Sequence, residues 1–293
     1  MSSRLLAGIA LLWVIGLAHA DEHPVSMWQI DGETNRVYLL GSIHLLRAED
    51  HPLPAVLEAA YADAESLIME LDMDDIDPVA LQSLTSEYGL ISGDSSLREL
   101  MGEARYQQAA AAAETLGVPL EMLARTEPWL AAISVEQLIL TRVGFNPAYG
   151  IEMHMTTKAV LDKKPVTGLE TVEEQLQFLD NLSLDAQVSL LMQTLEEGAD
   201  LDTGMDDMVR AWREGDTAYL EDEMLVQLQS YPELYQAIVA KRNRRWLASI
   251  EELLDDQDDY LIVVGALHLV GDDGVPELLK KRGLRVRQMH ETF

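Results

Sequence analysis

Two segments near opposite ends of the chain share one pattern, Leu39-Leu40-Gly41-Ser42-Ile43-His44-Leu45 and Val263-Val264-Gly265-Ala266-Leu267-His268-Leu269. Each is a short apolar run that ends in Gly-x-x-His, which is typical of a buried strand followed by a turn. The Gly lets the backbone turn or approach closely where the strand ends. Each His is thereby placed at the carboxyl edge of a sheet, where open α/β sheets bind their ligands.

The remaining strand signals fall mostly toward the two ends of the chain, and helical signals fill the middle. We expect strands over residues 27–30, 36–40, 66–71, 165–169, 260–264 and 284–289. Asp31-Gly32 between the first two strands permits a tight reversal. This order predicts an α/β fold of mixed α+β character, with a central sheet built from N- and C-terminal strands and a large helical insertion at about 77–255. No Gly/Ser-rich or Pro-rich linker divides the chain, so residues 21–293 are expected to form a single domain.

The first twenty residues have the pattern of an export signal. Arg4 precedes an apolar run over residues 5–17, and Ala18-His19-Ala20 matches a cleavage site. The run is shorter than the roughly 20 residues that span a bilayer. We expect cleavage after Ala20, no stable membrane insertion afterwards, and a periplasmic or secreted protein.

Composition narrows the classes of partner. The chain has 293 residues, 51 acidic and 21 basic side chains, a formal charge of −30 and no Cys. This charge disfavours nucleic acid, because phosphate binding needs clustered Lys and Arg, and it attracts cations such as divalent metal ions. The absence of Cys excludes disulfides, thiolate metal sites and cysteine nucleophiles.

Two acids follow apolar runs in the same way as the two histidines. Glu70 closes the run over residues 66–69, and Glu170 follows the run over residues 166–169. A carboxylate in such a position is costly to bury unpaired, so each should meet a metal or a cation. If both acids converge with His44 and His268, the four resemble a hydrolytic metal site with an open position for water. The alternative is that the histidines only satisfy hydrogen bonds in the core and the acids stabilise helix N-termini.

Several segments resemble the TraB/PrgY/GumN family, to which the Tiki proteases are related. They follow one another in the family's order and cover nearly the whole chain after residue 20. The segments are 38–44, Pro52-Leu53-Pro54, 69–72, Glu127-Pro128-Trp129, 147–152, 168–171 with Glu174-Gln175, Arg242-Asn243 with Trp246, and 264–271. The resemblance implies a metal-dependent hydrolase clan with paired Gly-x-x-His motifs and essential acids, including proteases thought to use manganese or cobalt.

The resemblance also assigns roles to residues of this chain. It implies that the catalytic and metal-binding side chains are His44, Glu70, Glu170 and His268. Gly41 and Gly265 would shape the backbone beside them, and Arg47 and Asn243 would hold substrate or an oxyanion. Glu152 occupies a position where the family has an acid. The rest of the basic run over residues 241–245 is interpreted as a helix face that pairs with local acids.

The sequence therefore favours an exported metal-dependent hydrolase, and among hydrolases a peptidase, that acts on a peptide or another small substrate. The cofactor would be a divalent ion, namely Mn, Co or Zn, and one Glu would bind it while the other served as general base. One alternative is a non-catalytic periplasmic protein that binds a peptide or a metal-containing ligand. Another is a structural domain whose histidines only bond to the backbone.

Overall fold

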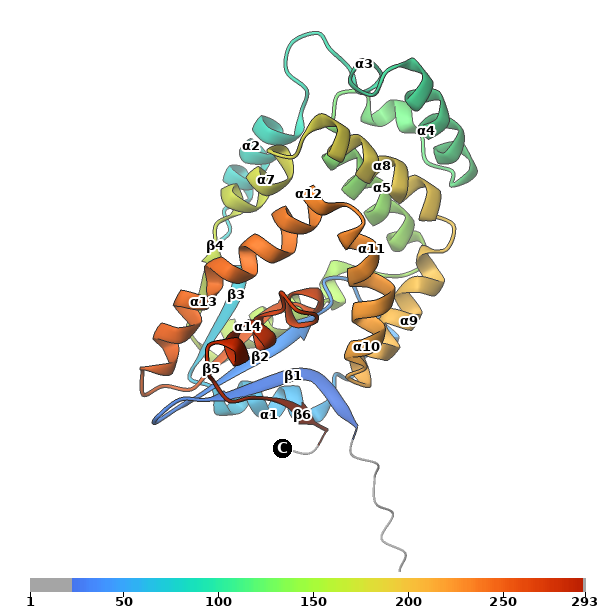
Figure 1. Cartoon of the computed structure of the whole chain (residues 1–293). Helices are drawn as coiled ribbons and strands as arrows, with labels where there is room; N and C mark the ends of the chain where they lie inside the picture. Colours follow the sequence, from blue (N-terminus) through green and yellow to red (C-terminus); the bar gives the residue numbers. More distant parts are fainter. Residues whose placement is uncertain (1–22, 292–293) are drawn as a thin grey trace, which may run out of the picture.

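The computed structural model describes residues 23–291, so the predicted export signal over residues 1–20 lies outside the described residues. Its centre is a six-stranded sheet, which occupies the lower half of Figure 1. Each strand coincides with a predicted one to within a few residues. The strands are β1 (Pro24–Asp31), β2 (Arg36–Ser42), β3 (Ser66–Leu71), β4 (Val166–Glu170), β5 (Tyr260–Gly265) and β6 (Val286–His290).

The order of the strands across the sheet is β4-β3-β5-β2-β1-β6. The hairpin β1–β2 is antiparallel, and β6 pairs antiparallel with β1. β5 pairs parallel with both β2 and β3, and β3 pairs parallel with β4. The predicted mixed α/β fold is confirmed, and the carboxyl ends of β2, β5, β3 and β4 lie along one edge of the sheet.

The parallel strands have apolar side chains on both faces, as expected when helices cover both sides of a sheet. Leu39 and Leu40 of β2 and Ile262 and Val263 of β5 are completely buried. In Figure 1, α1 (Ala55–Asp63) lies on the opposite side of β1 and β2 from α13 (Lys241–Leu254) and α14 (Val275–Lys281). Buried residues of all three helices belong to the main hydrophobic cluster around the sheet.

β4 divides the helical middle of the chain into two blocks. The block before it contains α2 (Pro78–Gly89), α3 (Leu97–Met101), α4 (Glu103–Thr115), α5 (Pro128–Arg142) and α6 (Ile151–Asp162). The block after it contains α7 (Val172–Asp180), α8 (Leu184–Glu197), α9 (Leu201–Arg213), α10 (Thr217–Tyr219), α11 (Val226–Gln229), α12 (Pro232–Tyr235) and α13. Two π-helical segments, η4 (Leu220–Leu225) and η5 (Gln236–Ala240), interrupt the second block.

The helices farthest from the sheet form a core of their own. α3, α4, α5 and α8 occupy the upper part of Figure 1, and most of their buried apolar side chains belong to a second hydrophobic cluster. Among residues 23–291, no helix has both the length and the apolar character needed to cross a bilayer. The candidate site residues lie away from this second core, at the edge of the sheet.

Candidate functional site

The two Gly-x-x-His motifs lie side by side because β5 pairs with β2. Ser42 is the register partner of Gly265, and Gly41 is the partner of Val264. After β5 the chain forms the short 3-10 helix η6 (Ala266–Leu269). A Cβ added to Gly41 would lie 3.1 Å from Ala266 Cα, so the missing side chain of Gly41 lets η6 pack closely on β2.

Three of the predicted site residues meet beside Gly265. A Cβ added to Gly265 would lie 3.4 Å from Glu70 Oε1, 3.5 Å from His268 Cδ2 and 3.6 Å from His44 Nε2. The Gly265 N–H donates to Glu70 Oε1 over 2.7 Å, and His268 Nε2 lies 3.8 Å from the same oxygen. The structure thus brings His44, Glu70 and His268 to one point at the carboxyl edge of the sheet.

Glu152 of α6 orients His44. His44 Nδ1 lies 2.7 Å from Glu152 Oε1, and the Ser42 hydroxyl donates to the same oxygen. This leaves Nε2 directed toward Gly265. The Glu152 carboxylate outweighs desolvation and raises the pKa of His44 to about 9. The His44 side chain nonetheless remains 61% exposed, so it is reachable from solvent.

Asn243 of α13 orients His268. Asn243 Nδ2 donates to the backbone oxygens of His268 and Asp273 over 3.1 and 2.8 Å, so its Oδ1 is the free acceptor. His268 Nδ1 lies 2.6 Å from that Oδ1, which assigns the ring proton to Nδ1 and a lone pair to Nε2. Burial lowers the pKa of His268 to about 3, so the ring is neutral at pH 7. Asn243, predicted to hold substrate or an oxyanion, bonds instead to His268.

Arg242 places a buried positive charge in the site. Its Nη2 lies 2.5 Å from Glu70 Oε2 and 2.7 Å from Glu170 Oε2, and its Nη1 lies 3.2 Å from His268 Nε2. The side chain is only 9% exposed. The basic run over residues 241–245 therefore does pair with acids, but Arg242 reaches acids that are far away in sequence. In the sequence, only the family resemblance of Arg242-Asn243 distinguished Arg242 from the other basic residues of this run.

Glu170 is enclosed by donors. Its side chain is 0% exposed, and Arg242 Nε and Nη2 donate to it over 2.7–3.1 Å. Arg245 Nη2 and Trp246 Nε1 each add a hydrogen bond of 3.0 Å. Both oxygens of Glu170 are thus occupied by side chains of α13. The sequence predicted that this strand-end acid would meet a metal or a cation, and it meets the cations Arg242 and Arg245. These contacts hold α13 against the end of β4.

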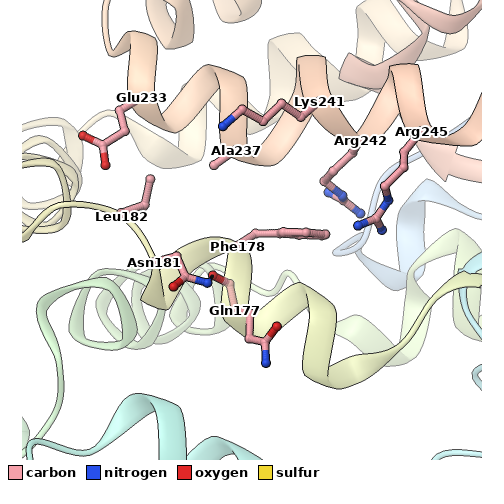
Figure 2. Close-up of a pocket in the computed structure, with 9 residues that line it drawn as sticks. All are labelled: Gln177, Phe178, Asn181, Leu182, Glu233, Ala237, Lys241, Arg242 and Arg245. Carbon is pink, nitrogen blue, oxygen red and sulfur yellow. Dashed lines mark hydrogen bonds between the residues drawn. The ribbon is translucent and has the colours of Figure 1, made fainter.

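Figure 2 shows Arg242 and Arg245 extending from α13 toward Phe178 of α7. Their guanidinium carbons lie 5.5 and 5.1 Å from the centre of the Phe178 ring, close enough for cation–π attraction. A cavity of about 330 Å³ lies here between α7 and the segment from Glu233 to Arg245. Phe178 and Glu170 thus hold the arginines from two sides, which fixes the position of Arg242 beside Glu70.

Arg47 does not join the site. Its guanidinium pairs with Asp206 of α9 and lies 4.4 Å from the centre of the Phe145 ring. Further carboxylates, those of Glu49 and Asp50, lie within 4 Å. Arg47 lines neither of the two cavities that His44 borders. The positive charge beside the candidate ligands comes from Arg242 instead.

His44 and Glu70 line two adjoining cavities, which together form the cleft. One has a volume of about 310 Å³ and extends toward Glu152 and Gln175. The other has a volume of about 330 Å³ and contains His268, Arg242 and Glu136 of α5. Glu136 lines this cavity while remaining exposed to solvent; partial desolvation raises its pKa, and nearby His44 opposes this shift. The sequence carried no signal for Glu136, because it lies within a helix far from any strand end.

A sequence profile of the TraB/PrgY/gumN family matches residues 26–288, a range that contains all the site residues above. The chain belongs to this family. The uncharacterized protein YbaP of Escherichia coli (strain K12) is 24% identical over 243 residues, which cover 83% of this chain and 87% of YbaP. An uncharacterized protein of Treponema pallidum (strain Nichols) is 23% identical over 275 residues, covering 88% of this chain and 80% of that protein. No solved structure matches.

The site of this TraB/PrgY/gumN protein offers donors suited to a divalent ion. His44 Nε2 and Glu70 Oε1 meet beside Gly265, and His268 Nε2 lies 3.8 Å from Glu70 Oε1. The other nitrogen of each ring is held by Glu152 or Asn243. Metal-binding histidines are usually oriented in this way. Among residues 23–291, however, no three His, Asp or Glu side chains already have a coordinating arrangement. An ion at this point would require Arg242 to release His268 Nε2.

Proposed function

We propose that this protein is an exported, metal-dependent hydrolase that cleaves peptides. The observation that supports the proposal is the meeting of His44 Nε2, Glu70 Oε1 and His268 beside Gly265, with both rings held at Nδ1. A divalent ion (Mn, Co or Zn) held by His44, His268 and Glu70 would supply a Lewis acid and lower the pKa of a bound water.

Glu70 is suited to hold a cation rather than to accept a proton. Burial opposes its ionisation, but His268 and Arg242 outweigh burial and lower the pKa of Glu70 to about 2. A general base works best when its pKa lies nearer the working pH. Glu136, whose pKa is raised, lines the same cavity as His44. We assign Glu136 the role of accepting a proton from the attacking water and passing it to the leaving amine.

Arg242 replaces Arg47 and Asn243 as the residue that stabilises negative charge on the substrate. It is a permanent cation in a mostly buried position beside Glu70 and His268. A fixed donor of this kind contributes strongly to catalysis when it faces the oxygen on which charge develops. Asn243 would act through His268, by holding its ring.

Metal binding is the first test. The chain from residue 21 onward would be titrated with Mn²⁺, Co²⁺ and Zn²⁺ and compared with the His44→Ala/His268→Ala double variant. The matched control is His51→Ala/His154→Ala, which removes two histidines whose rings lie 5.4 Å apart outside the site. We expect one tight site per chain in the wild type and the control, and none in the first variant. Equal weak binding by all three proteins would refute the proposal.

Turnover is the second test. The metal-loaded protein would be incubated with a peptide library, and products would be identified by mass spectrometry. Glu136→Gln should lower kcat by about 10²–10⁴-fold, the usual contribution of a positioned acid or base, while metal affinity stays within twofold. Unchanged turnover in Glu136→Gln would remove this residue from the mechanism.

One observation favours a second function, that of a non-catalytic peptide-binding protein. Arg242 already donates to Glu70, Glu170 and His268 Nε2, so all three groups have a hydrogen-bond partner without an ion. Such a protein would capture a peptide stoichiometrically and release it unchanged. Recovery of intact peptide from a saturated complex in the presence of each metal would favour this function over the hydrolase.

A further inference from the structure

The cavity that contains His44, Glu70, His268 and Arg242 has an apolar wall facing these polar residues. Helices and π-helical segments after β4 build this wall, and the cavity that it borders also contains the candidate site. We call this wall the methionine pocket, and it is formed by Met205, Met208, Leu220, Met224, Leu228 and Ile238.

We infer that the methionine pocket is the subsite for one large aliphatic side chain of a peptide and that it sets the preference for peptides. This inference rests on the proposed function, because the peptide is its substrate. The pocket is continuous with the point where His44, Glu70 and His268 meet. A side chain seated in it would hold the neighbouring peptide bond beside that point, which is how binding energy orients a reacting group.

The size of the cavity limits the occupant. A volume of about 330 Å³ lies at the lower end of the range for ligand sites. Part of that volume lies beside His44, Glu70 and His268, so the remainder against the apolar wall suits one side chain. Selectivity would therefore concern a single position of the peptide.

Burial indicates that the pocket still exposes apolar surface. Leu220 is completely buried, whereas Met205, Met208, Met224, Leu228 and Ile238 are only partly buried. Covering these side chains with an aliphatic group removes apolar surface from water on both partners, which favours binding. The pocket should therefore bind a peptide with Leu or Met at this position more tightly than one with Gly.

The residue types point to tolerance among large aliphatic side chains. Methionine is unbranched and polarizable, so it adapts to occupants of different shape. Leu220 and Met224 belong to η4 and Ile238 to η5, and π-helical turns occur frequently at functional sites. We expect Leu, Met and Ile to be accepted similarly.

The charge around the pocket disfavours an acidic side chain. Glu70 and Glu136 line the same cavity, and Arg242 is already paired with Glu70 and Glu170. A carboxylate placed against the apolar wall would lose hydration and would share the cavity with the carboxylates of Glu70 and Glu136. Peptides with Glu at this position should therefore bind least.

The experiment uses the chain from residue 21 onward with ¹³C-labelled methionine methyl groups, kept free of metal so that peptides stay intact. The probes are acetyl-Ala-Ala-X-Ala-Ala-amides with X as Leu, Gly or Glu. The Leu peptide should shift the signals of Met205, Met208 and Met224 at a concentration at least tenfold lower than the Gly peptide. Met122, which is 81% exposed on the second core, serves as the internal control. Equal shifts with Leu and Gly, or none, would overturn the inference.

Two different pocket variants are used so that a failure to fold is not mistaken for a loss of binding. Met224→Trp would fill the pocket, and Met208→Gln would make it polar at nearly unchanged size. Each should weaken binding of the Leu peptide at least tenfold, whereas the matched variant Met122→Trp should leave it unchanged. Wild-type affinity in a folded Met208→Gln protein would count against the pocket.

The outcomes separate this inference from the proposed function. Selective shifts with a Leu peptide that stays intact with every metal would support the pocket and refute the hydrolase. Cleavage of Leu and Gly peptides at equal rates, without shifts of Met205, Met208 and Met224, would overturn the pocket and leave the hydrolase standing.

Discussion

The backbone N–H of Gly265 donates to Glu70 Oε1 over 2.7 Å, and this bond joins the end of β5 to the end of β3. Gly265 belongs to the second Gly-x-x-His motif, whereas Glu70 lies 195 residues earlier in the chain. The insertion of β5 between β2 and β3 therefore unites residues that no local motif connects. Gly265 also lies where the rings of His44 and His268 meet, so its lack of a side chain can be tested directly.

Gly265→Ala should block the site while preserving the fold. Gly265 has φ −51° and ψ 138°, which Ala adopts without strain. The new methyl group would make ordinary contacts of 3.4–3.6 Å with Glu70, His268 and His44, filling the space between the donors. We expect Mn²⁺ affinity and peptide turnover to fall at least tenfold, with a change in Tm below about 4 °C.

The matched control for this prediction is Gly204→Ala in α9, where an added Cβ meets nothing within 4 Å. Calorimetric titration of both variants should show normal binding in Gly204→Ala alone. If Gly265→Ala bound metal like the wild type, the donors would not share the space beside residue 265.

The strands could be predicted because their signals are local. Buried parallel strands read as continuous apolar runs, and Gly41 and Gly265 mark where two of them end. Glu70 and Glu170 were identified for the same reason, since each follows such a run. The location of the site at one edge of the sheet then follows from the topology, because parallel strands bring their carboxyl ends together.

The rest of the site depends on contacts that sequence patterns do not encode. Arg242 resembles its basic neighbours in the sequence, and only the packing of α13 on β4 shows that it reaches Glu70. Glu136 lies within a helix and becomes part of the cleft through the position of α5. Arg47 lies three residues after His44, yet α9 supplies Asp206 to draw its guanidinium away.

Metal binding should compete with a proton on His44. The Glu152 carboxylate raises the pKa of His44 to about 9, so the metal-free ring is protonated at neutral pH. A ligand nitrogen must lose its proton to bind metal, so affinity should rise about tenfold per pH unit between pH 7 and 8.5. In Glu152→Gln the pKa should return toward about 6.5, and affinity should level off above about pH 7.5. Titrations with Mn²⁺ across this range measure both slopes.

The His44–Glu152 pair should also affect stability, but its contribution should fall as the pH rises, whereas metal affinity should increase. Because folding raises the pKa of His44 and lowers that of Glu152, the pair stabilises the metal-free protein fully between about pH 4.5 and 6.5, and this contribution is lost as the pH rises through about 9. Urea unfolding should therefore separate wild type from Glu152→Gln at pH 6 and bring them closer at pH 10. A separation that grew with pH would contradict the assigned protonation state.

Glu170 should matter mainly for stability. Glu170→Gln removes a fully buried carboxylate that pairs with Arg242, whose side chain is 9% exposed. Removing one partner of a buried ion pair costs about 3–5 kcal/mol, and we expect the lower end because Glu70 still pairs with Arg242. The matched control is Glu174→Gln, whose carboxylate is 43% exposed and 3.6 Å from Arg245, so it should cost less than about 1 kcal/mol. Similar urea midpoints for both variants would remove the structural role of Glu170.

Asn243 should act on the site only through His268. Asn243→Ala removes the acceptor 2.6 Å from His268 Nδ1, so the ring loses its fixed orientation. Loss of such a partner usually lowers metal affinity about 10–100-fold. Asn243→Asp keeps an acceptor for Nδ1 but loses the donor to the His268 and Asp273 backbone oxygens. Metal affinity should therefore stay closer to wild type in Asn243→Asp than in Asn243→Ala, even if both variants are destabilised. Equal losses of metal affinity in two folded variants would instead indicate that the backbone hydrogen bonds of Asn243 position His268.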